Sequence, residues 1–165
     1  LADTVAVTIA PLTIGSVETS PGALTLRPGD TATVATVVRS TGGATLSDIP
    51  ISWQSSDSAA ASVNAAGVVT ALFYVGASTR SVAIIAAAGA HADTTALTIE
   101  PLAIASVTIA APDSSLLPGA TLQLDVSVRD AAGLLLVDRP VTWTALDAAV
   151  ATVDAAGLVT GAVYG

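Results

Sequence analysis

The sequence predicts an all-β protein built from antiparallel β-sandwiches. Hydrophobic residues make up 52% of the chain but aromatic residues only 3%, so its apolar residues are mostly small or β-branched. Such side chains favour pleated strands. Short alternating runs, clearest at residues 121–128, are separated by turn signals about every ten residues, as in a sandwich. A third observation, an internal repeat, extends this prediction to more than one sandwich.

The chain contains the same unit twice, at a constant offset of 90 residues and without a gap. Trp53 falls on Trp143, and Gly67 falls on Gly157. Self-similarity at a fixed period indicates a repeat protein in which each unit is one structural module. We therefore expect tandem sandwiches placed end to end.

The repeat also predicts the domain boundaries. Residues 2–9 match residues 92–99, so the first stretch corresponds to the last strand of a preceding repeat. The second copy has no counterpart of residues 76–101, and thus lacks its last two strands. The predicted parts are a terminal strand of a preceding repeat at residues 1–11, a complete repeat at residues 12–101 and an incomplete repeat at residues 102–165.

Two interpretations of the incomplete repeat are open. The simpler one is that the sequence is an excerpt of a longer repeat chain, which we favour. The other is that residues 1–11 of a neighbouring molecule add to the incomplete repeat as its terminal strand, producing a head-to-tail polymer. That strand alone would still leave one strand of the repeat without a counterpart.

Proline and glycine divide the first half of the complete repeat. Pro21 and Gly22 interrupt a run of strand-forming residues, and Pro28 with Gly29 favours a turn. Alternation in the next strand predicts which side chains face the core, namely Ala32, Val34, Thr36 and Val38. The strands expected in this half are residues 14–19, 23–27 and 31–38.

The second half is arranged around a tryptophan and a glycine turn. Trp53 lies mid-strand in a β-branched run, which predicts that its indole is buried in the core, as for Trp143. Gly67 ends a turn that begins at Asn64, where a positive φ is often required. The strands expected here are one around Trp53 and residues 60–63, 68–71, 81–88 and 94–99.

These motifs, in this order, resemble bacterial Ig-like domains of group 2. In the second copy they are Ile-Ala-Ser-Val at residues 104–107, Leu-Leu-Pro-Gly at 116–119, Pro-Val-Thr-Trp at 140–143 and Ala-Thr-Val-Asp-Ala-Ala-Gly-Leu-Val-Thr at 151–160. The resemblance implies Ig-like sandwiches in tandem and an extracellular or cell-surface location, as in intimin- and invasin-like adhesins. It implies no catalytic residues.

Charge and composition argue against several classes of function. The net charge of −8 disfavours binding to nucleic acid or to anionic lipid headgroups. The longest uncharged apolar run, residues 82–90, is too short to insert into a membrane as a helix. The chain has no Cys or Lys, and its one histidine, His91, lies in an expected loop at residues 89–93. We therefore expect no enzyme activity and no catalytic residues.

Calcium is the one cofactor that the sequence leaves possible, because loop carboxylates at the end of a sandwich suit this ion. The alternative is that each carboxylate accepts hydrogen bonds from its own backbone. The candidates are Asp3, Asp93, Asp57 and Asp147. The residues expected to have a structural role are Trp53, Trp143, Gly67, Gly157 and Pro101.

The predicted function is a non-catalytic structural repeat of an extracellular stalk or surface filament. Residues 99–104, between the two repeats, contain one Pro and no Gly, which favours a stiff spacer. Its partners would be adjacent Ig-like repeats of the same chain or neighbouring copies in a fibre. The alternative is an adhesive module that binds a host or neighbouring-cell ligand through loops or a sheet edge. It would use segments that differ between the copies: residues 40–44 against 130–134, and 54–56 against 144–146.

Overall fold

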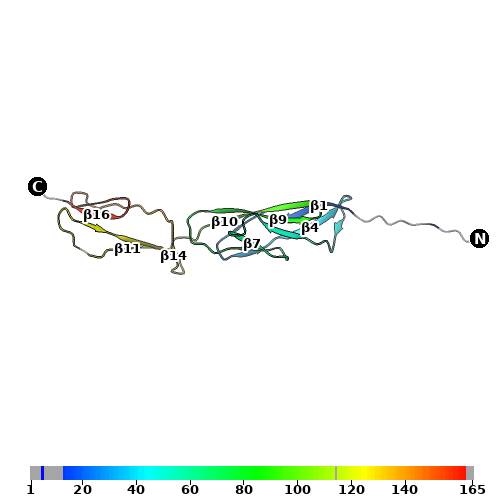
Figure 1. Ribbon diagram of the computed structural model, residues 1–165, viewed down its shortest axis with the longest axis horizontal. Coiled ribbons are helices and arrows are strands. Elements are labelled where there is room, and N and C mark those ends of the chain that lie inside the picture. The colour runs from blue at the N-terminus through cyan, green and yellow to red at the C-terminus, as the bar shows by residue number, and fades with distance from the viewer. Residues whose placement is uncertain (1–4, 6–12, 114, 163–165) are drawn as a thin grey trace, which may run out of the picture. The chain divides into compact units, whose positions relative to one another are not determined.

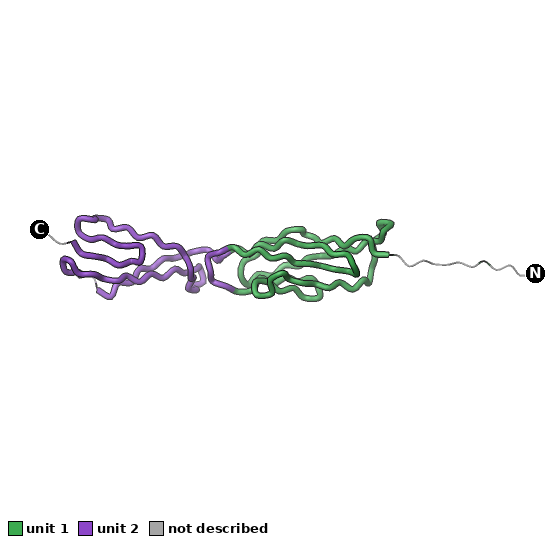
Figure 2. The backbone as a smooth tube through the Cα atoms, turned by 45° about the horizontal axis from the view of Figure 1, so that its top comes forward, with its two compact units in different colours: residues 1–73, 79–100 green, residues 74–78, 101–165 purple. Residues whose placement is uncertain are grey.

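The computed structural model describes residue 5, residues 13–113 and residues 115–162. The predicted terminal strand at residues 1–11 therefore lies, apart from Val5, outside the described residues. Figure 2 shows the chain divided into two units. Unit 1 comprises Leu1–Phe73 and Thr79–Glu100, and unit 2 comprises Tyr74–Ser78 and Pro101–Gly165. The described residues contain strands and turns and no helix, which confirms the all-β prediction.

Unit 1 contains three sheets. The first has the order β1-β4-β5, and the second has the order β2-β10-β9-β6, with β2 parallel to β10 and the other pairs antiparallel. The third has the order β3-β8-β7. The strands are β1 (Ile14–Ser20), β2 (Ala23–Leu26), β3 (Thr31–Thr33), β4 (Ala35–Ser40), β5 (Thr45–Leu46), β6 (Ser52–Ser55), β7 (Ala61–Val63), β8 (Val68–Ala71), β9 (Arg80–Ala88) and β10 (His91–Ile99).

The strand expected at residues 31–38 is divided at Val34, so that prediction was wrong in one respect. β3 pairs with β8, whereas β4 pairs with β1 in another sheet. At the break, the N–H of Val34 donates to the carbonyl of Gly67 at 2.9 Å. The predicted alternation survives the break, since Val34 and Val38 are 1% and 5% exposed.

The loop expected at residues 89–93 is shorter than predicted. β10 begins at His91, and its pairing with β9 runs from His91 opposite Ala88 to Ile99 opposite Arg80. Gly89 has a φ of 60°, which allows a two-residue turn. His91 and Asp93 are therefore strand residues. Figure 1 shows β9 and β10 side by side.

The core of unit 1 depends on this β9–β10 hairpin. Val17 and Val38 form a buried cluster with Ala86 and Ala88 of β9, and Trp53 packs against it. Thr95 is fully buried, and its hydroxyl donates to the carbonyl of Pro21 at 2.8 Å. The largest fully buried side chains are those of Ile84, Leu97, Ile99, Val34, Val69 and Thr95.

Unit 2 reproduces two of the three sheets of unit 1. β11-β13-β14 corresponds to β1-β4-β5, and β12-β16-β15 corresponds to β3-β8-β7. No counterpart of the sheet β2-β10-β9-β6 occurs in the part of unit 2 that the structure describes. The strands are β11 (Ser106–Ala110), β12 (Thr121–Gln123), β13 (Asp125–Arg129), β14 (Leu135–Leu136), β15 (Ala151–Val153) and β16 (Leu158–Gly161).

Residues 74–78 belong to unit 2, although the repeat in the sequence assigns them to the first copy. The N–H of Val137 donates to the carbonyl of Val75 at 3.3 Å, and the hydroxyl of Tyr74 donates to the carbonyl of Ser78. The end-to-end arrangement of the two units stays a prediction.

Candidate functional site

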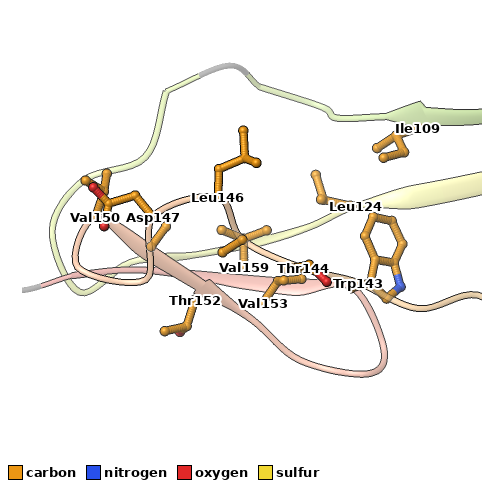
Figure 3. Close-up of a pocket in the computed structure, with 12 residues that line it drawn as sticks. Ile109, Leu124, Trp143, Thr144, Leu146, Asp147, Val150, Thr152, Val153 and Val159 are labelled. Carbon is orange, nitrogen blue, oxygen red and sulfur yellow. The ribbon is translucent and has the colours of Figure 1, made fainter.

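The candidate site is the side of unit 2 on which the described residues form no counterpart of the sheet β2-β10-β9-β6. A mostly apolar cavity of about 420 Å³ opens there. Figure 3 shows Trp143, Ile109 and Leu124 grouped at one end of the cavity, with Val150 and Asp147 at the other. A second cavity of about 370 Å³ shares part of this wall and is lined by Leu116, Leu122, Leu124 and Val159, among others. We call this region the open side of unit 2.

Apolar side chains on the open side are exposed where their counterparts in unit 1 are buried. Val107 is 57% exposed, whereas its counterpart Val17 is 6% exposed. Val150 is 54% exposed, whereas its counterpart Ala60 is 1% exposed. In unit 1 the hairpin β9–β10 contributes to the buried cluster of Val17, whereas no such hairpin occurs in the described part of unit 2. The open side thus exposes apolar surface that a complete sandwich encloses.

The two tryptophans, which the sequence places in the core, are each half-buried. Trp53 packs against the core cluster of unit 1, while Trp143 lines the cavity of unit 2. A large indole rarely becomes fully buried. In unit 2, Trp143 forms part of the wall of the cavity, which leaves part of its side chain exposed.

Gly67 and Gly157 occupy the tight turns that the sequence predicted. Their φ angles are 76° and 81°. In the first copy, Oδ1 of Asn64 accepts hydrogen bonds from the N–H groups of Ala66 and Val68 at 2.9 and 3.0 Å. Asp154 accepts the equivalent pair in the second copy. These turns hold each glycine beneath its tryptophan.

The carboxylates proposed as calcium ligands accept backbone hydrogen bonds. Oδ1 of Asp57 accepts from the N–H of Ala59 at 2.9 Å, and Oδ1 of Asp147 accepts from that of Ala149 at 2.8 Å. Asp3 lies outside the described residues. Within the described ranges, no group of three His, Asp or Glu side chains is placed to hold a metal ion. Calcium binding at these positions stays a prediction.

Asp93 links β10 to β1. Its Oδ2 accepts hydrogen bonds from the backbone N–H of Thr19 at 2.7 Å and from the Thr19 hydroxyl at 2.9 Å. The Thr19 N–H is the main cause that lowers the pKa of the Asp93 carboxyl below its usual value, followed by the N–H of Thr94 and the Thr19 hydroxyl. These bonds stabilise the charged form of the carboxyl.

We expect Asp93→Asn to be less stable than the unaltered chain at neutral pH, by about 1 kcal/mol in the free energy of unfolding. The pKa of Asp93 is lower in the folded than in the unfolded chain. The contribution of the Asp93 carboxyl to the free energy of unfolding is therefore complete above its pKa in the unfolded chain. This contribution is lost as the pH falls through its pKa in the folded chain. Urea unfolding between pH 7 and pH 2 should show a shallower acid limb for Asp93→Asn. The exposed Glu100→Gln is the control, and equal acid limbs for all three proteins would contradict the expectation.

His91 and Pro101 complete the residues singled out in the sequence. His91 is partly exposed at the start of β10, and Pro101 is partly exposed outside any strand.

No helix in the described part of the chain has the length and apolar character needed to cross a membrane.

One of the two pairs of segments that differ between the copies, residues 40–44 and 130–134, has the same geometry in both units. The N–H of Ala44 donates to Oγ of Ser40 at 3.1 Å, and the N–H of Leu134 donates to Oδ1 of Asp130 at 2.8 Å. Gly43 and Gly133 have φ angles of 83° and 82°. Ser40 and Asp130 therefore each accept a hydrogen bond from the N–H four residues further along the chain. The difference in sequence between these two loops gives no support to an adhesive role for them.

Leu146, in the segment 144–146 that the sequence singled out as different between the copies, is the most exposed large apolar residue of the open side. Its counterpart is Ser56, whose N–H and Oγ both bond to the backbone of Ala83 in β9, each at 2.9 Å. The replacement of a serine by a leucine at this position was visible as a difference between the copies. Both positions are exposed, so the difference between the copies lies in the apolar character of the side chain.

Residues 103–165 match the model of the bacterial Ig-like domain (group 2). The chain is 30% identical over 155 residues to Ice-binding protein 1 of Shewanella frigidimarina, covering 93% of this chain. It spans 17% of the length of that protein.

Two solved structures are similar at lower identity. Domains 5–6 of the S-layer protein SbsC are 17% identical, with a TM-score of 0.47, over 92% of this chain and 85% of that one. The Escherichia coli adhesin FdeC is 17% identical, with a TM-score of 0.45, over 91% of this chain and 57% of that one. The fold follows from the strand pairing and from the family match of residues 103–165. Residues 103–165 therefore belong to the bacterial Ig-like domain family, group 2.

Proposed function

We propose that this chain is a non-catalytic structural segment of a bacterial surface protein, in which successive Ig-like units act as a stiff spacer. One observation carries the proposal: strand pairing is reproduced at the same offset of 90 residues that relates the two copies in the sequence. Val17 pairs with Val38 in unit 1, and Val107 pairs with Val128 in unit 2. Units repeated in this way can be added in series to set a length.

The family match and the larger relative support a place within a longer extracellular or cell-surface protein. The chain corresponds to less than a fifth of Ice-binding protein 1, as expected of a segment that repeats within a larger molecule. Its partners in this function are adjacent Ig-like repeats. The adhesive alternative has less support at residues 40–44 and 130–134, because these two loops have the same hydrogen-bonded geometry.

Stiffness can be tested by measuring distances between the units. The chain has no cysteine, so Thr41→Cys with Ala155→Cys places one spin label on an exposed turn of each unit. A stiff spacer gives one narrow distance distribution in pulsed electron resonance, because residues 99–104 contain Pro101 and no glycine. The matched control carries four Gly-Ser residues inserted between Glu100 and Pro101. If the unaltered chain gives a distribution as broad as this control, the spacer is not stiff.

A further inference from the structure

A groove of about 360 Å³ lies beside the tryptophan of unit 1. It is lined by residues 33–36, residues 65–66, Ile49, Ile51 and Trp53, and we call it the Trp53 groove. Its walls come from two different sheets, because β4 belongs to the sheet β1-β4-β5 and β6 to the sheet β2-β10-β9-β6.

One wall of the groove is the open edge of β6. Among the described strands, β6 is the last in its sheet and pairs only with β9. The N–H of Ser56 donates to the carbonyl of Ala83 at 2.9 Å, which continues the register of β6 and β9. Hydrogen-bonded and non-hydrogen-bonded pairs alternate along an antiparallel ladder. The backbone groups of Gln54 therefore face β9, whereas those of Trp53 and Ser55 face the open edge.

The opposite wall also has an open edge. β4 pairs with β5 at Val38 and Arg39 only, so no described strand continues this pairing towards the start of β4. The N–H of Ser40 donates to the carbonyl of Ala44 at 2.8 Å. By the same alternation, the backbone groups of Thr36 point to the side of β4 on which β5 lies. The groove thus has unpaired backbone groups on both walls.

We propose that the Trp53 groove binds an extended polypeptide segment of a neighbouring protein, which adds to the open edge of β6. The segment bonds to the backbone of Trp53 and Ser55, and its alternate side chains enter the groove. A strand edge without charged residues or proline is a template for such pairing. β6 has the sequence Ser-Trp-Gln-Ser and contains neither.

The charges around the groove define the chemistry of the segment. None of the residues that line the groove is ionisable, so the side chains that enter it must be uncharged. Exposed carboxylates lie on both sides of β6 in the sequence, at Asp48 and Asp57. Within the described residues neither forms an ion pair, unlike Glu18 with Arg39. The segment that fits has an uncharged centre and a basic residue at each end.

A second copy of the chain fits this edge less well. Two β6 strands paired with one another would bring Asp48 and Asp57 of both copies close together. Each chain also carries a net charge of −8. Like charges across an interface oppose association, whereas a segment with basic ends meets opposite charge at both ends of the edge.

The edge of β6 is held in place without a partner. Trp53 packs against the core cluster of unit 1, and the N–H and Oγ of Ser56 both bond to the backbone of Ala83 at 2.9 Å. A preorganised edge reduces the entropy lost on binding. Residues 54–56 are also one of the two segments that differ between the copies, so the sequence that holds this edge belongs to the first copy.

The test is a titration of the full chain with the peptide acetyl-Arg-Thr-Val-Thr-Val-Thr-Arg-amide. In a Trp143→Phe background, Trp53 is the only indole and reports on the groove. We expect a saturable change in Trp53 fluorescence up to about 2 mM peptide, with downfield NMR shifts of the amide protons of Trp53 and Ser55. No saturable change at these two residues overturns the proposal.

Altered peptides separate strand pairing from charge. The valines enter the groove and lie opposite Trp53 and Ser55, so N-methyl groups on both valines remove the donors that face β6. Binding should weaken at least about tenfold, whereas N-methyl groups on two threonines should leave it unchanged. Glutamate in place of both arginines should also weaken binding about tenfold. Equal binding of the valine-methylated or the glutamate peptide overturns the proposal.

Matched variants of the chain locate the charge. Asp48→Asn should weaken binding of the arginine peptide about threefold, because one exposed ion pair is lost. Asp138→Asn is the control, since Asp138 is the counterpart of Asp48 and their φ angles are 55° and 58°. An unchanged affinity in Asp48→Asn, or an equal loss in Asp138→Asn, contradicts the proposed chemistry of the segment.

Sedimentation of the chain alone tests the second copy as the occupant. Proline is tolerated on an edge strand where the N–H faces outward, so Ser55→Pro blocks the edge of β6 and leaves its pairing with β9. If the unaltered chain dimerises and Ser55→Pro is monomeric, the edge binds a second copy and the proposal fails. The spin-label experiment measures stiffness and not binding, so this proposal and the spacer proposal can fail separately.

Discussion

Ile84→Ala lowers the free energy of unfolding of unit 1 by about 3 kcal/mol, whereas Ile85→Ala lowers it by about 1 kcal/mol. The two residues are neighbours in β9 and are chemically identical, but their side chains lie on opposite faces of the strand. Ile84 is fully buried, while Ile85 is partly exposed. Truncation at Ile84 removes buried methyl groups and leaves a cavity, and truncation at Ile85 removes groups that are already partly in water.

Urea unfolding followed by fluorescence measures this difference. In a Trp143→Phe background, Trp53 is the only indole, and it packs against the core cluster that contains Ala86 of β9. Ile84 and Ile85 lie in the same strand and have the same side chain. The change in β propensity on substitution by alanine is therefore the same in both variants and cancels when their stabilities are compared. Equal losses at Ile84 and Ile85 would show that β9 does not present these two faces to the core and to solvent.

The strands and turns of the repeat could be predicted because their signals are local. Alternation along residues 31–38 identified Val34 and Val38 as core residues, although the strand itself divides. The turn at Gly67 followed from the Asn and Gly at its ends, and its φ of 76° agrees with that prediction. Such features depend on neighbours within a few residues.

The division of a strand between two sheets was not predictable from alternation. Both β3 and β4 have the same pattern of side chains, and only their partners differ. The N–H of Val34 bonds to Gly67, a residue distant in sequence, and this contact ends β3. Likewise, the early start of β10 at His91 depends on its pairing with Ala88.

The candidate site illustrates the same limit. The repeat in the sequence shows which strands have counterparts in residues 102–165, but it did not identify which side chains are exposed there. Val107 and Val17 stand in equivalent, similar segments, yet their exposed fractions are 57% and 6%. Burial of Val17 depends on β9, a strand more than sixty positions further along the chain. No local pattern around residue 107 carries that information.

The turn beneath Trp53 should be among the most sensitive positions of the chain. We expect Gly67→Ala to lower the free energy of unfolding of unit 1 by about 3 kcal/mol. A methyl group at Gly67 would lie 2.9 Å from Cζ2 of Trp53 and would overlap the carbonyl oxygen of Val34. It would also hold an alanine at a φ of 76°, in the left-handed region. The displaced groups belong to the core strand β6 and to the break between β3 and β4, which limits how far they can relax.

Gly43→Ala is the matched control, because Gly43 has a φ of 83° and a methyl group there would meet no atom within 4 Å. It should cost about 1 kcal/mol, the penalty of the left-handed backbone alone. The difference between the two variants, measured by urea unfolding with Trp53 fluorescence, thus isolates the close approach of the turn to the indole and to Val34. The Trp53 emission spectrum of folded Gly67→Ala should also shift, since the ring must move. Equal losses of stability would mean that backbone conformation, and not this contact, is the reason for a glycine at position 67.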